Sequence, residues 1–545
     1  MKRLGIAAVI LVLAAVAAWL TWPVQIMVTA YRFTHPVAAN RPVHWAEGPA
    51  TPPAGERPPN IVLIVADDLG INDITTDGPG TGVAGGLVPT PNIDSIARDG
   101  ADFTVAYAAN ATCSPSRAAL MTGRYPQRFG FEFTAVPDEL AKYMPRYAPQ
   151  DRPYPILYHA DLQHQAPPMG QMGMPASEVT IAELLKTRGY HTIHLGKWHL
   201  GEAKGMRPED QGFDESLGFM AGASKYEADT AGPEARLPGD PLDRLLWLGL
   251  RDAVQFNGSK PFHAGEYMTD YLSDQAAAAI RANRNRPFFI YLAYNAPHTP
   301  YQATKADYNA LGAIHDERAR VYGAMVRGLD RGVGKVLAAL KAQGLDRSTL
   351  VIFTNDNGGT KATGMPDINK PYRGWKGTFF EGGIRVPFLV RWPARVAPGQ
   401  KLATPVNFVD VLPTLAAAGR AEVPTDRKID GIDLLRLMTG QPAPERALFW
   451  RSGTYEAIRD GDWKLQVSRN PSRIWLFDLA SDPTERHDLS TSRPDVVQRL
   501  RAELAAHDRE LAKPLWPALL EEPIRIDYPA DAPWKPGQEY VYWPN

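Results

Sequence analysis

The chain has 545 residues, of which 44% are apolar and 22% are charged, and its 59 basic side chains almost balance its 60 acidic ones. These proportions are typical of a soluble globular protein, and they exclude a polytopic membrane protein, a disordered chain and a collagen-like fibre. The net charge of −1 provides no general basic field, so we expect no nucleic-acid partner. The single cysteine, Cys113, can form neither an intrachain disulfide nor a CxxC zinc site.

The N-terminus has the pattern of an export signal. Lys2 and Arg3 precede an apolar run over residues 4–20. This run is long for the core of a cleaved signal and close to the lower limit for crossing a bilayer, so residues 1–30 are either a signal peptide or a signal anchor with membrane contact. The positive-inside rule places the rest of the chain outside the cytoplasm. The lack of disulfides favours the bacterial periplasm, or the outer face of the inner membrane, over a eukaryotic lumen.

A folded body is expected after a proline-rich tether over residues 31–58. Continuous apolar strands that alternate with helices indicate an α/β fold, in which helices cover both faces of a large, mostly parallel sheet. The predicted strands are residues 61–65, 192–195, 288–294 and 350–353, and the clearest predicted helices are residues 181–188 and 320–343.

Ionisable or metal-ligating residues follow each of these four strands. Open α/β sheets bind ligands outside the carboxyl ends of their strands, so we expect these side chains to meet at one edge. A single acidic pair or histidine after a strand would be interpreted as a turn or a structural residue, whereas four such strand ends indicate a site. The residues are Asp67, Asp68, Lys197, His199, His298, Asp356 and Asn357.

The chemistry of this set indicates an oxyanion site. Carboxylate and amide oxygens without clustered sulfur or imidazole favour Ca²⁺, and less strongly Mg²⁺, over zinc. Two lysines and two histidines add cationic and proton-transferring groups, which suit an anionic substrate with a leaving group that must be protonated. The oxygen ligands are Asp67, Asp68, Asp356 and Asn357, and the other groups are Lys197, His199, His298 and Lys376.

The segment around Cys113 reads NATCSPSRAALMTGR over residues 110–124. It predicts a helix that Cys113 caps, with Pro115 in its first turn and Gly123 as its stop signal. A helix N-terminus favours anions, and Arg117 lies one turn away from Cys113 on the same face. A buried structural cysteine is the alternative interpretation, although the polar Ser-Pro-Ser-Arg flank argues against it.

Several blocks in this order resemble the formylglycine-dependent sulfatase family of the alkaline phosphatase superfamily. CSPSRAALMTGR resembles the family signature and GKWHLG the second signature, while APHTP, NDNG and KGTFFEGGIRVP also match. The resemblance implies a catalytic α/β domain over residues 59–440 with a large mixed, mostly parallel sheet. It further implies a smaller C-terminal antiparallel sheet over residues 441–512. Residues 513–545 lie beyond the matched blocks, and we expect them to form a tail that wraps the body.

The resemblance also implies a sulfuric ester hydrolase that cleaves an aryl or carbohydrate sulfate to an alcohol and inorganic sulfate. A formylglycine-generating enzyme would oxidise Cys113 to Cα-formylglycine, and one hydroxyl of the hydrated aldehyde would attack sulfur. The resemblance also implies a role for each residue that stands at a matched position. Ca²⁺ would be held by Asp67, Asp68, Asp356, Asn357 and an oxygen of residue 113. Lys197 and Lys376 would bind the sulfate, His298 would contact it and protonate the leaving oxygen, His199 would accept the hydrate proton, and Arg117 would hold the formylglycine.

Two alternatives stay open. Phosphonate monoester and phosphodiester hydrolases share this fold and the formylglycine, and a phosphodiester carries the same single charge as a sulfate monoester. An inactive sulfate-binding pseudoenzyme is the alternative without catalysis, although no implied catalytic residue is missing. Substrate choice is expected to come from loops, with residues 131–176 as the first candidate and residues 220–265 as a second insertion.

Overall fold

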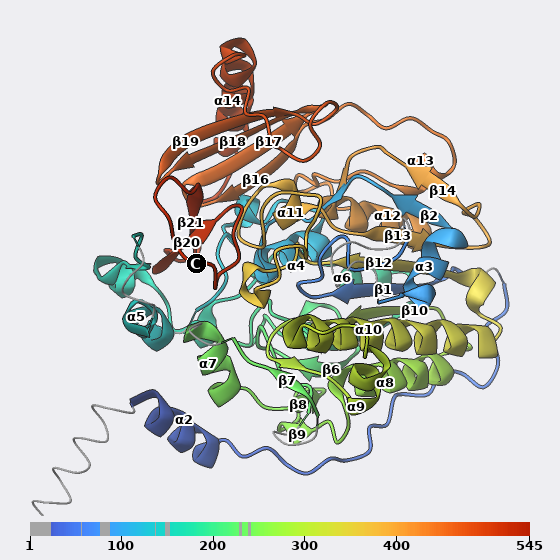
Figure 1. The fold of residues 1–545 in the computed structure, drawn as a ribbon. Helices are drawn as coiled ribbons and strands as arrows, with labels where there is room; N and C mark the ends of the chain where they lie inside the picture. Colours follow the sequence, from blue (N-terminus) through green and yellow to red (C-terminus); the bar gives the residue numbers. More distant parts are fainter. Residues whose placement is uncertain are drawn as a thin grey trace, which may run out of the picture.

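A large mixed sheet forms the centre of the computed structural model, which describes residues 23–545 except 56, 77–87, 137, 148–152, 228–231 and 238–240 (Figure 1). Its middle strands β12, β1, β10, β5 and β6 run parallel, and the strands next to them, β13 and β8, are antiparallel. In spatial order the strands are β14 (Gln400–Leu402), β2 (Ala101–Phe103), β13 (Phe388–Arg391), β12 (Thr349–Asn355), β1 (Asn60–Ala66), β10 (Phe288–Ala293), β5 (His191–Lys197), β6 (Glu215–Phe219), β8 (Ala253–Phe256) and β9 (Phe262–His263).

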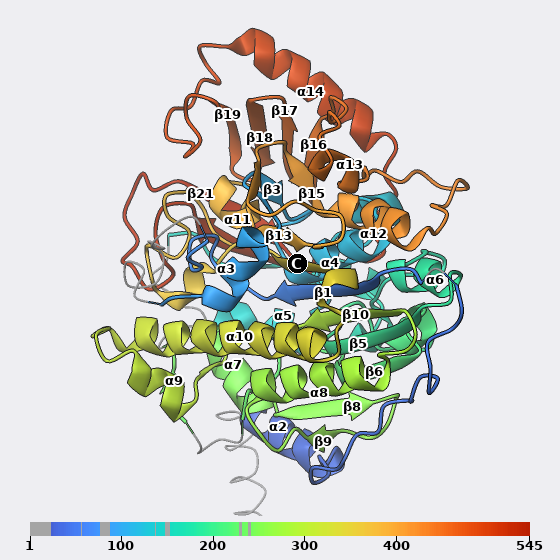
Figure 2. The ribbon, with the colours of Figure 1, turned by 90° about the vertical axis from the view of Figure 1, so that its right-hand side faces the viewer.

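Helices cover both faces of this sheet, as the sequence predicts (Figures 1 and 2). Strand β1 is buried along its whole length because its alternate side chains enter two different cores. Val62 and Ile64 pack in the core that contains α8 and α10, whereas Ile61 and Leu63 pack in the core that contains α4, α6 and α12. The covering helices are α3 (Pro91–Arg98), α8 (Met268–Ala282) and α10 (Glu317–Ala342) on one face, and α4 (Cys113–Thr122), α6 (Ile181–Lys186) and α12 (Val411–Gly419) on the other.

A second, antiparallel sheet lies beside the large one and is covered on its outer side by α14 (Figure 2). We call it the small sheet. Together with the mixed large sheet it confirms the expected fold class. Its strands and helix are β16 (Leu448–Ser452), β17 (Tyr455–Asp460), β18 (Trp463–Arg469), β19 (Ser472–Asp478) and α14 (Pro494–Asp508).

The C-terminal segment adds strands of its own. Strand β20 (Leu520–Arg525) pairs with β21 (Tyr540–Pro544) on one side and with β4 (Leu157–Tyr158) on the other. The tail is therefore joined by backbone hydrogen bonds to the candidate specificity loop. The remaining short elements are α2 (Pro23–Thr34), α5 (Asp138–Tyr147), α7 (Pro241–Gly249), α9 (Lys305–Ala310), α11 (Glu381–Ile384), α13 (Leu435–Met438), β3 (Ala106–Tyr107), β7 (Glu234–Ala235), β11 (Tyr301–Gln302) and β15 (Val406–Asn407).

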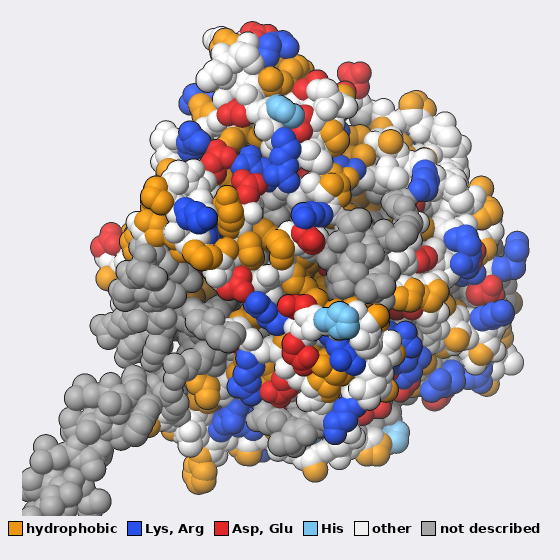
Figure 3. Space-filling view, in the orientation of Figure 1, with side chains coloured by type: hydrophobic (Ala, Val, Ile, Leu, Met, Phe, Trp, Pro, Cys, Tyr) orange, Lys and Arg blue, Asp and Glu red, His pale blue; other side chains and the backbone are white. Residues whose placement is uncertain are grey.

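The predicted export signal falls almost entirely on residues 1–22, which lie outside the described part of the chain. Within the part that is described, no helix combines the length and the apolar character needed to cross a membrane. On the face drawn in Figure 3, Lys and Arg side chains are interspersed with Asp and Glu, as a net charge of −1 leads one to expect.

Candidate active site

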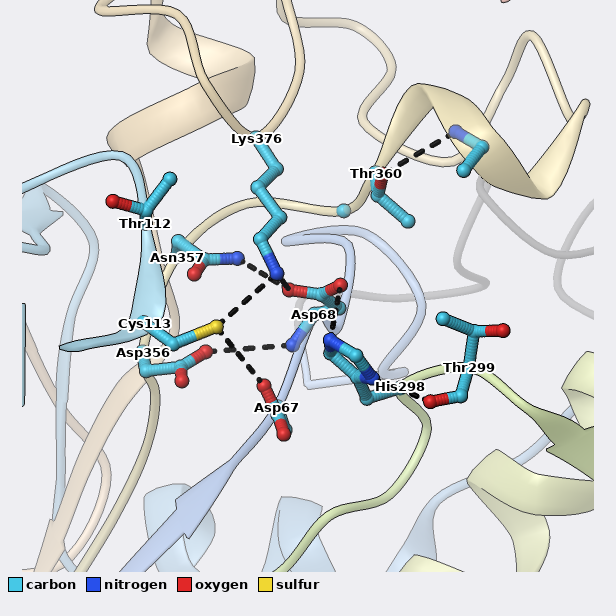
Figure 4. Close-up of polar contacts among 12 residues, drawn as sticks. Asp67, Asp68, Thr112, Cys113, His298, Thr299, Asp356, Asn357, Thr360 and Lys376 are labelled. Atoms are coloured by element: carbon cyan, nitrogen blue, oxygen red, sulfur yellow. Dashed lines mark hydrogen bonds and ion pairs between the residues drawn. The ribbon is translucent and has the colours of Figure 1, made fainter. Parts of the chain in front are cut away.

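The strand ends bring the predicted residues to one edge of the sheet (Figure 4). Asp67 and Asp68 follow β1, and Asp356 and Asn357 follow β12, which is hydrogen-bonded to β1 in register. Lys197 is the last residue of β5, and His298 comes shortly after β10. Because these strands are parallel neighbours, their carboxyl ends, and the side chains that follow them, meet in one place.

Helix α4 delivers Cys113 and Arg117 to the same place. The helix begins one residue earlier than predicted, because Thr112 occupies the cap position and Cys113 is the first helical residue. Gly123 ends the helix in the left-handed conformation, with φ of 67°. Arg117 is fully buried, and its Nε donates to Oδ2 of Asp356 at 2.8 Å. Its Nη1 donates to the carbonyl of Lys197 at 3.2 Å. Arg117 therefore connects α4 to the carboxyl ends of β12 and β5.

Two buried lysines pair with the carboxylates after β1. Nζ of Lys197 lies 2.7 Å from Oδ2 of Asp67, and Nζ of Lys376 lies 2.7 Å from Oδ1 of Asp68. Burial alone would raise the pKa of Asp67, but Lys197, His298 and Arg117 outweigh burial and hold that pKa well below its usual range. Burial would lower the pKa of Lys376, but Asp68 and Cys113 raise it. The pKa shifts of Asp67 and Lys376 therefore both favour the charged form of the side chain.

The thiol of Cys113 sits between these charges. It donates to Oδ1 of Asp67 at 3.5 Å, and Nζ of Lys376 donates to its Sγ at 3.1 Å. Burial, followed by the charge of Asp356, raises the pKa of Cys113 to about 12. A thiol with that pKa carries no appreciable thiolate at neutral pH, so the unmodified cysteine is a poor nucleophile.

The two predicted histidines differ in their surroundings. Nδ1 of His298 donates to the carbonyl of Thr299 at 2.6 Å, which leaves Nε2 facing Oδ2 of Asp68 at 3.6 Å. His199 has a backbone φ of 59°, and Oγ of Ser114 donates to its carbonyl at 2.7 Å. Burial lowers the pKa of both imidazoles, and for His199 the nearby Lys197 lowers it further. His199 is therefore held in its neutral form beside Ser114, the residue that follows Cys113.

The cluster fits a divalent cation in its donor chemistry. One ligand atom from each of Asp67, Asp68, Cys113 and His298 lies within 4.8 Å of the others. Of the other two predicted ligands, Asp356 accepts at Oδ1 from the backbone of Asp68 at 3.4 Å. Asn357 donates from Nδ2 to Asp68 at 2.7 Å, while its Oδ1 is buried without a hydrogen-bond partner. An unpartnered buried oxygen beside buried carboxylates is what a hard-cation site requires.

Other contacts of the site have no signal in the amino-acid sequence. The hydroxyl of Tyr291 accepts from Nη1 of Arg117 at 3.3 Å, yet a tyrosine inside an apolar strand carries no signal of this role. The candidate specificity loop and the tail form a single structure, because Oη of Tyr542 donates to the carbonyl of Pro155 at 2.9 Å and the Tyr154 ring stacks on that of Tyr540 at 3.8 Å. The tail also reaches the segment after Asn357, since Lys361 pairs with Glu522 at 2.6 Å.

Comparison with known proteins identifies the family. The sulfatase family model matches residues 59–420, and the model for the C-terminal part of N-sulphoglucosamine sulphohydrolase matches residues 374–510. Steryl-sulfatase of Mus musculus is 34% identical over 85% of this chain and 83% of its own length. Arylsulfatase A of Homo sapiens is 33% identical over 82% of this chain and 87% of its own length.

Solved structures agree with this assignment. The crystal structure of Ps i-CgsB has a TM-score of 0.70 and 32% identity, and the match covers 84% of this chain and 95% of that one. The phosphonate monoester hydrolase of Agrobacterium radiobacter, with a TM-score of 0.58 and 19% identity, shares the fold. The clustered strand-end residues, the two family models and relatives at about one-third identity over most of the chain lead to one conclusion. The chain belongs to the sulfatase family, and it is an enzyme that hydrolyses sulfate esters.

Proposed function

We propose that the enzyme cleaves an aryl or carbohydrate sulfate monoester through Cα-formylglycine formed from Cys113, with a divalent cation bound beside it. The observation that carries this proposal is the position of Cys113. Its thiol is buried with a raised pKa, yet it lies 3.1 Å from the ammonium of Lys376 and 3.5 Å from the carboxylate of Asp67. Charged groups that surround an unreactive thiol support the conversion of Cys113 to another group. Sγ occupies the position at which the hydrated aldehyde would carry its hydroxyl oxygens.

The ligands proposed for the cation are the oxygens of Asp67, Asp68, Asp356 and Asn357, joined by an oxygen of residue 113. When bound, Ca²⁺ would supply positive charge beside the sulfuryl group that is transferred. Calcium suits these all-oxygen ligands better than zinc does.

The side chains around Cys113 perform the remaining chemistry. Lys197 and Lys376 offer two ammonium groups to the spectator oxygens of the sulfate, where negative charge concentrates as the ester bond breaks. His298 would donate a proton from Nε2 to the leaving oxygen in its protonated form, which Asp67 and Asp68 favour against burial. The neutral His199 would accept the proton that accompanies sulfate release. Arg117 is buried behind Cys113 and orients it through the start of α4.

Sulfated saccharides and small aryl sulfates are the substrate classes that we propose. The structure of Ps i-CgsB in complex with a neocarrahexaose supports the first class, and the similarity to arylsulfatase A supports the second. A phosphodiester or phosphonate monoester remains the alternative substrate class for the same site, and the similarity to a phosphonate monoester hydrolase extends to the fold alone.

We further propose that the enzyme acts outside the cytoplasm, in the bacterial periplasm or on the outer face of the inner membrane. The basic and apolar N-terminal pattern supports export, with membrane contact if the segment is not cleaved. Maturation would require a formylglycine-generating enzyme as a partner, because the chain itself contains no oxidant for its cysteine.

The test is to co-express the full chain with a formylglycine-generating enzyme and to confirm the aldehyde at residue 113 by mass spectrometry. The kcat/KM values should then be compared for a chromogenic aryl sulfate, the matched phosphodiester and a panel of sulfated saccharides. We expect a sulfate ester to be the best substrate. A phosphodiester that is preferred by about 100-fold, equivalent to about 2.7 kcal/mol, would refute the proposed reaction.

A further inference from the structure

A buried ionic cluster outside the active site joins the small sheet to the large domain. Nζ of Lys464, on β18, lies 2.7 Å from Oε1 of Glu381 at the start of α11. It also lies 2.9 Å from Oε1 of Glu485. The exposed fraction of all three side chains is 0%. Figures 1 and 2 both place α11 next to the small sheet, so Lys464 bridges two parts of the fold.

Each charge in this cluster is hydrogen-bonded. The hydroxyl of Tyr107 donates to Oε2 of Glu381 at 2.9 Å, and Nε2 of Gln466 donates to Oε1 of Glu485 at 3.0 Å. The backbone N–H of Glu381 donates to Oε2 of Glu485 at 2.6 Å. Burying such charges gains little stability over a well-packed apolar core of the same volume, whereas removing one partner is costly. The cluster therefore calls for a role other than stability, and precise positioning is the role that its geometry suggests.

Glu381 belongs to the segment that carries Lys376, which we call the Lys376 loop (residues 373–383). This loop is folded back on itself, because Gly382 N donates to the carbonyl of Arg373 at 2.7 Å. Its interior is tightly packed: a Cβ on Gly383 would lie 2.1 Å from the carbonyl oxygen of Thr378. A displacement of Glu381 would therefore be passed to the rest of the loop.

The loop is held from both sides. On the side of the small sheet, Phe379 N donates to the hydroxyl of Tyr455 at 3.0 Å, and the two rings stack at 4.6 Å. On the side of the active site, Lys376 N donates to the carbonyl of Gly359 at 3.1 Å. Gly377 N donates to the carbonyl of Ala111, two residues before Cys113, at 2.9 Å. The position of the Lys376 ammonium relative to Sγ of Cys113 thus depends on the contacts between the small sheet and the loop.

We propose that Lys464 is a positioning residue for Lys376, so that the small sheet is part of the catalytic apparatus although it touches no reacting atom. Without the lysine, Glu381 keeps Arg385 as a partner, at 3.1 Å from its Oε2, but no ammonium lies between its Oε1 and Glu485. Relief of the repulsion between these two buried carboxylates moves Glu381 together with the loop. A displacement of about 1 Å is enough to cost an enzyme about 100-fold in rate. This inference rests on the proposed function, because it assumes that Lys376 acts on the sulfate ester.

A double-mutant cycle tests the proposal. In the matured full-length enzyme, Lys464→Met should lower kcat/KM by about 10–100-fold, mainly through kcat. In the background of Lys376→Ala the same change should cost less than about 3-fold, because the group that it positions is already absent. Unchanged activity of Lys464→Met would overturn the proposal. So would an equal loss in both backgrounds, since that is the result of a general structural defect.

A matched control separates positioning from stability. Arg128 and Asp430 form another buried pair, at 2.6 Å and with exposed fractions of 4% and 5%. Arg128→Met should lower the melting temperature in the same way as Lys464→Met but leave kcat/KM of the folded enzyme within about 3-fold. If Lys464→Met is insoluble, Lys464→Gln takes its place in the cycle with the same expectations, because a neutral amide can donate hydrogen bonds to the two carboxylates but cannot neutralise their charges.

Binding of inorganic sulfate provides a readout that needs no turnover. Measured by calorimetry, it should be weakened by Lys376→Ala and by Lys464→Met, with the double variant no weaker than Lys376→Ala alone. Additive losses would overturn the positioning role. If the wild-type enzyme binds sulfate but hydrolyses no sulfate ester, the proposed function fails while this cycle still decides the role of Lys464. If turnover is normal and the losses are additive, only the positioning role fails.

Discussion

The ammonium of Lys376 lies 3.1 Å from Sγ of Cys113, although 263 positions separate the two residues in the chain. The same ammonium pairs with Asp68 at 2.7 Å, so it bridges the reactive position and the proposed cation site (Figure 4). A cation at this point would stabilise negative charge that develops on a sulfate attacked at residue 113.

Replacing Cys113 by serine should abolish sustained turnover. Serine offers one hydroxyl, which could attack sulfur once, but it lacks the second hydroxyl that releases sulfate from a formylglycine hydrate. A time course should show at most one equivalent of product, and mass spectrometry should find either a sulfated or an unreacted serine. Cys113→Ala is the control and should be inert while still binding inorganic sulfate. Many turnovers by Cys113→Ser would contradict the mechanism.

Asp68→Asn should lower divalent-cation content and activity together. The substitution removes the charge that Lys376 and the proposed cation share, so we expect activity to fall by at least about 100-fold. Elemental analysis of the purified protein measures the bound ion, and calcium should restore a chelator-treated wild-type enzyme better than magnesium does.

The control for this experiment is Asp73→Asn. Burial raises the pKa of Asp73 to about 8, although hydrogen bonds from Tyr322 and Gly70 act against this rise. Asp73 is therefore mostly protonated at neutral pH, and a neutral amide of the same shape should change cation content little. Full cation content in Asp68→Asn would remove Asp68 from the ligands.

Loss of His298 should depend on the leaving group. A general acid typically contributes about 100–10,000-fold when the departing oxygen needs a proton. His298→Gln should therefore slow hydrolysis of a sulfated saccharide or alkyl sulfate by at least about 100-fold, but that of a nitrophenyl sulfate by about 10-fold or less. The measurement is kcat/KM against leaving-group pKa, which should become steeper in the variant. An equal loss across the series would assign His298 to sulfate binding alone.

Gly377→Ala should lower both stability and activity, whereas the same backbone strain at Gly440 should lower stability alone. Gly377 has a φ of 83°, and a Cβ there would lie 2.4 Å from Cδ1 of Ile524 in the C-terminal tail. Gly440 has the same φ of 83° with nothing within 4 Å of its Cβ position, so Gly440→Ala isolates the backbone strain. Both variants should lose about 1–2 kcal/mol of unfolding free energy, but only Gly377→Ala should lower kcat, by about 10-fold. Ile524→Val, which removes Cδ1, should restore part of the kcat.

His507 should make the protein less stable in mild acid. Its ring stacks on Phe449 at 4.0 Å, and burial, followed by the charge of Arg128, lowers its pKa to about 3. The folded state therefore binds this proton less readily than the unfolded state, whose histidine has a pKa of about 6.5. The contribution to stability is complete above pH 6.5 and is lost as the pH falls from there towards 3.

The measurement is urea unfolding of the wild type and of His507→Phe, which keeps the ring stack but cannot titrate. At pH 5 the wild type should lose about 1–2 kcal/mol more than the variant, relative to pH 7.5. The comparison between the two proteins cancels the carboxylates that also titrate in this range. Parallel pH profiles would show that His507 does not cause the loss.

The strands of the large sheet and the residues that form the active site were predictable, because both are indicated by local sequence patterns. A buried parallel strand is an apolar run whatever its neighbours are, and the residues after it face the same edge of the sheet in any such fold. For this reason Asp67, Lys197, His298 and Asp356 were predictable as members of one site from their places after β1, β5, β10 and β12. The start of α4 was misplaced by one residue, because Thr112 and Cys113 are both compatible with a cap.

The amino-acid sequence by itself determined the family, the sheet of the large domain and the list of residues that meet at its edge, since motifs and hydrophobic periodicity are properties of neighbouring residues. Only the tertiary structure decided which charges pair. Lys464 meets Glu381, Lys376 approaches Cys113, and β20 pairs with β4 across more than 350 positions of the chain. A buried charge requires a partner, but the partner is chosen by the packing of elements that are remote in the chain, and no local pattern encodes that choice.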